Sequence, residues 1–133
     1  MYYIKLIMKN IILKLLEYIY YFSLIILFIL YLYPGSLIGY FLYGNLEQQP
    51  NLIPNPIGTS INHLIFFSYI TTLALIVRSK AINIFTDYRI ILLISFILEI
   101  LHFIIPNRAF EFYDLIANVL GVLTIILLER LRK

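Results

Sequence analysis

The 133-residue chain contains no cysteine and few charged residues. The absence of cysteine excludes a disulfide framework, thiol chemistry and any cysteine-ligated zinc or iron–sulfur centre. Only 13% of the residues are charged, whereas 62% are hydrophobic and the mean hydropathy is +0.95. A soluble domain of this length cannot bury so large an apolar fraction in its core. The composition therefore predicts an integral membrane protein.

Several sequence motifs are missing as well. The chain shows no internal repeat, low-complexity tract, glycine-rich phosphate loop or nucleic-acid motif. The lysines near the N-terminus, Lys5, Lys9 and Lys14, are explained as a membrane-topology signal. We therefore expect no cofactor and no nucleic-acid partner, and we expect the chain to be surrounded by membrane lipids.

Four apolar runs approach the length of about 20 residues that a helix needs to cross a bilayer. They cover residues 15–33, 61–77, 88–105 and 112–128. The first run is long and aromatic and lacks a small-residue cleavage site, so we expect a retained anchor rather than a signal peptide. Thr59 and Ser60 precede the second run, and Thr86 and Asp87 precede the third, where their side-chain oxygens can cap a helix start. The sequence predicts an all-α integral membrane bundle of four transmembrane helices in a single domain, residues 1–133.

The positions of the basic residues predict the orientation of these spans, because positively charged flanks stay on the cytoplasmic side. With a cytoplasmic N-terminus, nine of the ten basic residues face the cytoplasm and only Arg108 faces outward. The nine are Lys5, Lys9, Lys14, Arg78, Lys80, Arg89, Arg130, Arg132 and Lys133. We therefore expect both termini to be cytoplasmic.

In this topology residues 34–60 form a long external loop, which contains four prolines and four glycines. Within it, residues 37–43 are apolar, and they either lie in the membrane interface or re-enter the membrane. We favour a proline-stiffened connector with an interfacial aromatic patch over a catalytic re-entrant loop, because tyrosine settles readily at headgroup depth.

Polar residues recur through the apolar second half of the chain. Glu99 and His102 are three apart and therefore share one face of the third predicted helix. Asp114, Asn118 and Gly121 follow at intervals of four and three on the fourth. The short turn between these helices should pack them as an antiparallel hairpin, with the two polar faces meeting and Gly121 permitting close backbone approach.

Arg108 lies at the turn above these faces, and Asn62 and His63 open the second helix on the same outer side. Ionisable groups are expensive inside a membrane, so spans that keep them commonly use them. The sequence therefore predicts an outward-facing polar pocket built from Asn62, His63, Glu99, His102, Arg108, Asp114 and Asn118.

The same residues admit a purely structural interpretation. Contacts of Glu99 with His102 and of Asp114 with Arg108 would hold the bundle together, each contributing on the order of 1 kcal/mol. A carboxylate at mid-depth costs roughly 2.5 to 3.5 kcal/mol, which favours a Glu99 that is neutral or paired with His102 or Arg108. A metal site from His63, Glu99, His102 and Asp114 is chemically possible, but the spacing does not support it and we expect none.

At these positions the chain resembles the VanZ-like family of small bacterial membrane proteins. Members carry a glutamate followed at three residues by glutamine, then proline, arginine, aspartate, asparagine and glycine. Here the pattern reads Glu99, His102, Pro106, Arg108, Asp114, Asn118 and Gly121. The family's second helix typically opens with an Asp-Lys pair, then Asn-His or His and aromatics, which Asn62-His63 and residues 66–69 resemble.

Two positions depart from the family pattern. Thr59 and Ser60 replace the Asp-Lys pair, which removes a charge pair from the mouth of the expected pocket. His102 replaces the usual glutamine and introduces a group that can titrate near neutral pH.

The resemblance implies a multi-pass protein of the bacterial plasma membrane, in a family named for a member associated with low-level resistance to the glycopeptide teicoplanin. Our hypothesis is that the pocket binds a lipid or amphiphile headgroup, with Arg108 as the anion contact and Glu99, Asp114 and Asn118 orienting it. One alternative is an enzyme acting on a lipid-linked phosphate or ester, with Glu99 or His102 as general acid or base. Another is an accessory subunit of a larger membrane complex, and a homo-oligomer is also open.

Overall fold

The computed structural model describes residues 2–50, 58–78 and 84–132. Within them every regular element is helical. In chain order these elements are α1 (Tyr2–Leu32), α2 (Leu37–Tyr43), α3 (Gly58–Val77), the 3-10 helix η1 (Ile84–Thr86), α4 (Tyr88–Leu101) and α5 (Phe112–Leu131). Three of them, α1, α3 and α5, are long and apolar enough to cross a membrane. The predicted all-helical fold with membrane-length helices is therefore confirmed.

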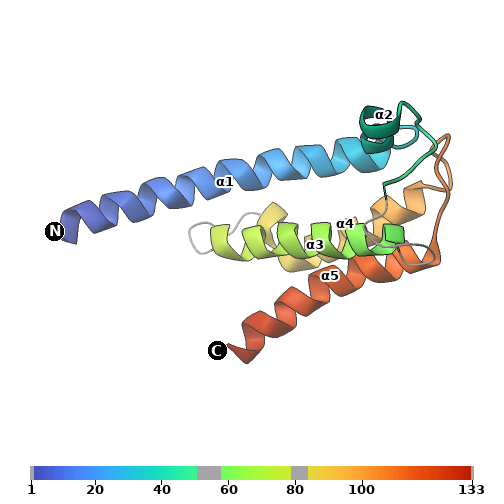
Figure 1. Cartoon of the computed structure of the whole chain (residues 1–133). Coiled ribbons are helices and arrows are strands. Elements are labelled where there is room, and N and C mark those ends of the chain that lie inside the picture. Colours follow the sequence, from blue (N-terminus) through green and yellow to red (C-terminus); the bar gives the residue numbers. More distant parts are fainter. Residues whose placement is uncertain (1, 51–57, 79–83, 133) are drawn as a thin grey trace.

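Helix α1 is longer than predicted, because it begins at Tyr2 instead of residue 15. Lysine is a good helix former, so Lys5, Lys9 and Lys14 do not interrupt the helix. Their charges limit how deeply this segment enters the hydrocarbon. The 31 residues of α1 extend about 46 Å at 1.5 Å per residue. Among the described side chains of α1, Tyr20 is the first that is buried, and the N-terminal half of the helix projects beyond the other helices (Figure 1).

Helix α4 is shorter than the predicted run of residues 88–105. Its 14 residues cover about 21 Å, less than the roughly 30 Å of a hydrocarbon core. After Leu101 the chain tightens into three-residue turns, in which the His102 N–H donates to the Glu99 carbonyl at 3.1 Å and Phe103 N–H to Ile100 at 3.1 Å. Pro106, which has no N–H, follows this tightened turn.

The predicted helix caps have mixed outcomes. Asp87 caps α4, since its carboxylate accepts a hydrogen bond from the Arg89 N–H at 3.0 Å. The prediction for Thr59 and Ser60 was wrong, because α3 already begins at Gly58 and both residues lie inside it. Ser60 instead directs its hydroxyl across the bundle to Asp114.

The apolar stretch of the external loop forms the short helix α2. The Ser36 hydroxyl accepts from the Gly39 N–H at 2.9 Å at its start, and Gly44, with φ +69°, ends it. Its aromatic side chains, Tyr40 and Phe41, are exposed. Residues 51–57 of the predicted loop lie outside the described residues.

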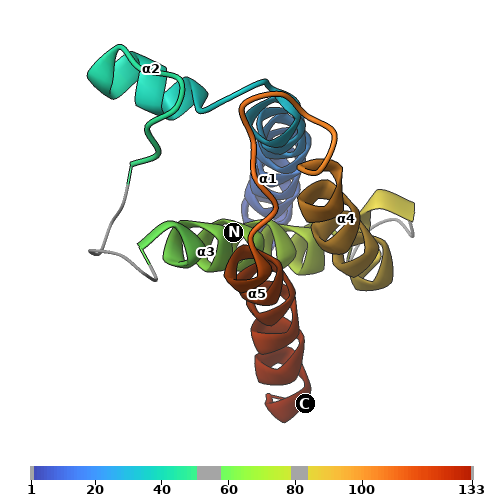
Figure 2. The ribbon, with the colours of Figure 1, turned by 90° about the vertical axis from the view of Figure 1, so that its right-hand side faces the viewer.

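The helix bundle has an apolar exterior and a partly polar interior. Helix α5 packs mainly on α3, with α1 and α4 beside them (Figures 1 and 2). Large apolar side chains such as Phe103 and Ile104 are exposed, whereas Glu99 and Asn118 are 0% exposed. Extensive exposed apolar surface together with buried charged groups is typical of a chain surrounded by lipid.

Candidate functional site

The polar residues gather where four helix ends meet, at the end of the bundle that also carries α2 (Figure 1). Tyr31 lies in the last turn of α1, and Glu99 lies in the last turn of α4. His63 and Asp114 lie near the starts of α3 and α5. An up-and-down order of helices brings these ends to one level, so residues far apart in the sequence form one cluster.

Glu99 lies at the centre of this cluster and accepts three hydrogen bonds. Its Oε1 accepts from His102 Nδ1 at 3.2 Å and from the Glu111 N–H at 3.3 Å. Its Oε2 accepts from Asn118 Nδ2 at 3.3 Å. The pairing of Glu99 with His102, expected from their spacing, is present, and the contact with Asn118 joins α4 to α5.

Asp114 pairs with different residues from those expected. Its Oδ1 accepts from the Ser60 hydroxyl at 2.5 Å, and its Oδ2 lies 3.4 Å from His63 Nε2. Both carboxylate oxygens thus face α3, and the structural alternative of an Asp114–Arg108 contact is not formed. The first turn of α5 also favours a carboxylate, because the free N–H groups there create a positive end.

Tyr31 is the cluster member that the sequence did not reveal. Its hydroxyl lies 2.6 Å from His63 Nδ1 and donates to Asn118 Oδ1 at 2.8 Å. Its ring stacks on His102 with 5.6 Å between centroids and 18° between planes. The chain has 12 tyrosines, and nothing in the spacing of the first helix distinguishes this one.

Arg108 binds the end of α1 rather than a carboxylate. Its Nη2 donates to the Leu30 carbonyl, and its Nε donates to the Tyr33 carbonyl at 3.3 Å. These carbonyls lack partners within the helix, and a cation suits the negative end of the helix dipole. Burial lowers the pKa of the Arg108 guanidinium, which nevertheless stays charged.

His102 makes contacts through both ring nitrogens. Its Nδ1 lies 3.2 Å from the Glu99 carboxylate, and its Nε2 lies 3.2 Å from the Tyr31 carbonyl. These contacts hold the imidazole between the ends of α1 and α4.

The hydrogen bonds around Asn118 fix the tautomer of His63. Asn118 directs its Nδ2 to Glu99 and to the Ser95 carbonyl, so its Oδ1 must accept. The Tyr31 hydroxyl donates its single proton to that oxygen, and His63 Nδ1 consequently carries a hydrogen of its own. His63 Nε2 lies 3.4 Å from Asp114 Oδ2, whereas Arg108 forms no ion pair with a carboxylate of the described residues.

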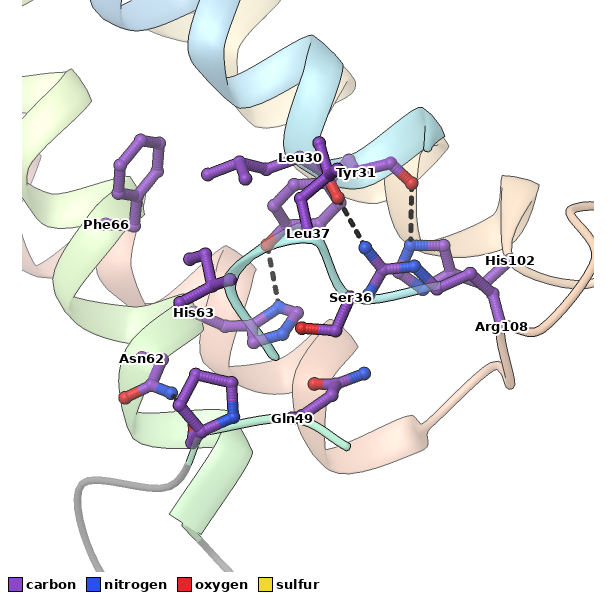
Figure 3. Close-up of a pocket in the computed structure, with 12 residues that line it drawn as sticks. Leu30, Tyr31, Ser36, Leu37, Gln49, Asn62, His63, Phe66, His102 and Arg108 are labelled. Carbon is purple, nitrogen blue, oxygen red and sulfur yellow. Dashed lines mark hydrogen bonds between the residues drawn. The ribbon is translucent and has the colours of Figure 1, made fainter. Parts of the chain in front are cut away.

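A pocket of about 120 Å³ opens beside this cluster (Figure 3). Its polar lining comes from Tyr31, Ser36, Gln49, Asn62, His63, His102 and Arg108, and its apolar lining from Leu30, Leu37, Ile38, Pro50 and Phe66. Of the predicted residues, four line the pocket, whereas Glu99, Asp114 and Asn118 are buried behind it. The contributions of α1, α2 and Gln49 were not predicted.

Asn62 connects the pocket wall to the external loop. Its Nδ2 donates to the Pro50 carbonyl at 2.7 Å, which holds Pro50 and the neighbouring Gln49 over the pocket. The loop that looked like a connector in the sequence therefore supplies part of the wall.

The described residues include no group of three or more His, Asp or Glu arranged to hold a metal ion. His63 illustrates the reason, because it faces Asp114 through Nε2 and Glu99 through Nδ1, at 3.4 and 3.9 Å. The two nitrogens of one imidazole ring cannot bind the same ion. The four residues considered for a metal site, His63, Glu99, His102 and Asp114, instead contact one another in pairs.

The fold and the site define a class of protein, a membrane-type helix bundle with a charged pocket at one end. In the comparisons with known proteins, no family model, no curated protein and no solved structure matches the chain. The VanZ-like family stays a prediction that rests on the residues from Asn62 to Gly121.

Proposed function

We propose that this protein binds the negatively charged headgroup of a lipid or amphiphile in the pocket beside Arg108. The observation that carries the proposal is Arg108, which lines the pocket and, among the described residues, donates to neutral backbone carbonyls of α1 and forms no ion pair with a carboxylate. A guanidinium in a partly desolvated pocket attracts an anion that can accept hydrogen bonds from its remaining N–H groups.

The surroundings of the pocket support a lipid as the source of that anion. Leu37 and Ile38 of α2 form one side of it, and the neighbouring Tyr40 and Phe41 are exposed. Aromatic side chains of this kind settle at headgroup depth. An amphiphile could therefore place its charge at Arg108 and its chains along α2 and the bundle.

We further propose a four-span topology in the bacterial plasma membrane with both termini cytoplasmic. The N- and C-terminal ends lie away from the α2 end of the bundle (Figure 1). Arg78 and Arg89 lie near the ring of Tyr88, with 5.6 and 5.9 Å to its centroid, a pairing typical of a membrane interface. Helix α4, extended by its tight turns, completes the fourth span, whereas Lys80 and Lys133 lie outside the described residues.

This topology is tested by single cysteines, which are unique labels because the chain has none. Ala109→Cys places a thiol at an exposed position beside Arg108, and Arg132→Cys places one near the C-terminus. In spheroplasts, an impermeant maleimide should label Ala109→Cys, and should label Arg132→Cys only after permeabilisation. The reverse pattern would contradict the orientation.

Replacing Arg108 tests the proposed binding. Arg108→Gln should weaken binding of phosphatidylglycerol about tenfold to a hundredfold, since a hydrogen bond to a charged group contributes about 1.5 to 3 kcal/mol. Arg108→Lys keeps the charge and should lose less affinity. Native mass spectrometry of delipidated protein with added lipid measures the effect.

The matched control is Arg132→Gln, which removes the same charge from an exposed position near the C-terminus. Circular dichroism and size-exclusion chromatography establish that each variant is folded. Equal affinities of folded Arg108→Gln and Arg132→Gln would contradict the proposed site.

The geometry favours binding over the enzymatic alternative. In the described site the Ser60 hydroxyl donates to Asp114 and not to an imidazole, so it is not activated as a nucleophile. Glu99 is occupied by three hydrogen bonds and is enclosed. If the protein is VanZ-like, loss of binding should appear as a loss of resistance to teicoplanin-type glycopeptides. For the alternative of a homo-oligomer or a larger membrane complex, we propose the projecting half of α1 as the contact surface.

A further inference from the structure

We propose that three arginines at the other end of the bundle form a second site, which binds the phosphate group of an anionic phospholipid. They are Arg78, directly after α3, Arg89 in the first turn of α4 and Arg130 in the last turn of α5. These helix ends lie away from α2 and from the pocket (Figure 1). The inference therefore does not depend on the proposed function of the pocket.

The three arginines come from three different helices and meet at one side chain, Tyr88. The guanidinium carbons of Arg78 and Arg89 lie 5.6 and 5.9 Å from the centroid of the Tyr88 ring, within the range of a cation–π contact. Arg89 and Arg130 also form side-chain hydrogen bonds with Tyr88. A topology signal requires only basic residues near the helix ends. The gathering of three of them around one ring is a further feature, which that signal does not explain.

The positive charge of this cluster is fixed, because an arginine guanidinium keeps its proton in proteins. The acidic residues next to the arginines in the sequence are Asp87 and Glu129. The described residues contain no ion pair between the three arginines and a carboxylate. The Asp87 carboxylate accepts from the backbone N–H of Arg89 at 3.0 Å, as the cap of α4. Like charges gathered in this way repel one another, and a phosphate relieves the repulsion while its oxygens accept from several guanidinium groups.

The position of the cluster along the helices indicates a lipid as the source of the phosphate. Helix α3 extends about 30 Å from Gly58 to Val77 at 1.5 Å per residue, and Arg78 follows it directly. This length is about the thickness of the hydrocarbon core of a bilayer. The cluster therefore lies at the headgroup level of one leaflet when the start of α3 lies at that of the other. Basic sites between transmembrane helices at this level are suited to anionic headgroups.

The test uses tryptophan fluorescence, because the chain contains no tryptophan. Ile84→Trp places a single emitter at an exposed position of η1, just before α4. The whole chain is reconstituted in phosphatidylcholine vesicles. Quenching by brominated phosphatidylglycerol is then compared with quenching by brominated phosphatidylcholine at the same mole fraction. We expect a preference for phosphatidylglycerol of about tenfold, which corresponds to about 1.4 kcal/mol.

Variants of Tyr88 distinguish an organised site from a general attraction to positive charge. In the Ile84→Trp background, Tyr88→Leu keeps every charge but removes the ring around which the arginines gather. It should reduce the preference about threefold or more. Tyr88→Phe keeps the ring and should retain more of the preference than Tyr88→Leu.

A matched pair of charge variants tests the arginines themselves. The double substitution Arg78→Gln and Arg130→Gln removes two charges of the cluster and should abolish most of the preference. The double substitution Lys5→Gln and Lys9→Gln removes two charges from exposed positions of α1, outside the cluster, and should leave it unchanged. Circular dichroism establishes that each variant is folded.

Three outcomes would overturn the proposed site. Equal quenching by the two brominated lipids would show that no anionic lipid is enriched there. A preference that is the same in Tyr88→Leu, or that falls equally with either pair of charge substitutions, would reduce the effect to general charge attraction. Complete displacement of the lipid by millimolar glycerol phosphate would identify a soluble phosphate, and not a lipid, as the ligand.

Discussion

Replacing Glu99 with leucine is expected to lower the free energy of unfolding by about 3 to 5 kcal/mol, the cost of removing one partner of a buried ion pair. The substitution leaves His102 without its carboxylate and removes the acceptor of the Glu111 N–H. It also removes the acceptor of the hydrogen bond from Asn118 Nδ2, the contact that joins α4 to α5. Unfolding in detergent, followed by circular dichroism, measures the change.

The matched control is Glu47→Leu, which makes the same exchange at an exposed position of the external loop. We expect its effect to lie within about 0.5 kcal/mol of wild type, as is usual for surface substitutions. If Glu99→Leu were as stable as Glu47→Leu, the buried network would not hold the bundle, and Glu99 would have to be retained for another reason.

Replacing Gly121 with alanine is expected to destabilise the bundle by about 1 to 3 kcal/mol, the usual effect of overpacking. A Cβ at this position would lie 2.6 Å from the Leu64 carbonyl oxygen and 3.1 Å from the Ser68 nitrogen, both backbone atoms of α3. Helices α3 and α5 would have to separate, and the contacts of Ser60 and His63 with Asp114 would lengthen.

The sign of the Gly121→Ala effect is informative, because alanine is intrinsically the better helix former by about 1 kcal/mol. Thr124→Ala is the control, since Thr124 is exposed on the same helix and alanine there has only its propensity to add. We expect Thr124→Ala to be neutral or slightly stabilising. A stabilised Gly121→Ala would show that the two backbones are not in close contact.

The parts of the fold that the sequence predicts well are those that depend on local composition. Apolar length identifies α1, α3 and α5, and the carboxylate of Asp87 marks the start of α4. The spacing of Glu99 and His102 correctly predicts their contact, because residues three apart share a helix face. Boundaries are less accurate where lysines lengthen α1 and tight turns shorten α4.

The parts of the site that the sequence misses depend on packing between distant elements. Tyr31 reaches His63 and Asn118 only because the last turn of α1 lies against α3 and α5. Arg108 binds backbone carbonyls of α1, which carry no signature in any sequence. Their opposite charges suggested that Arg108 and Asp114 would pair. Asp114 instead accepts a hydrogen bond from Ser60 and lies next to His63.

The attachment of Arg108 to Leu30 and Tyr33 has a mechanical consequence. The pocket lies at one end of a continuous helix of about 46 Å, whose opposite end projects beyond the other helices (Figure 1). A rotation of about 5° about the pocket end would move that opposite end by about 4 Å. The position of a spin label near Tyr3 should therefore report small movements of α1 around Arg108 as displacements of several ångströms.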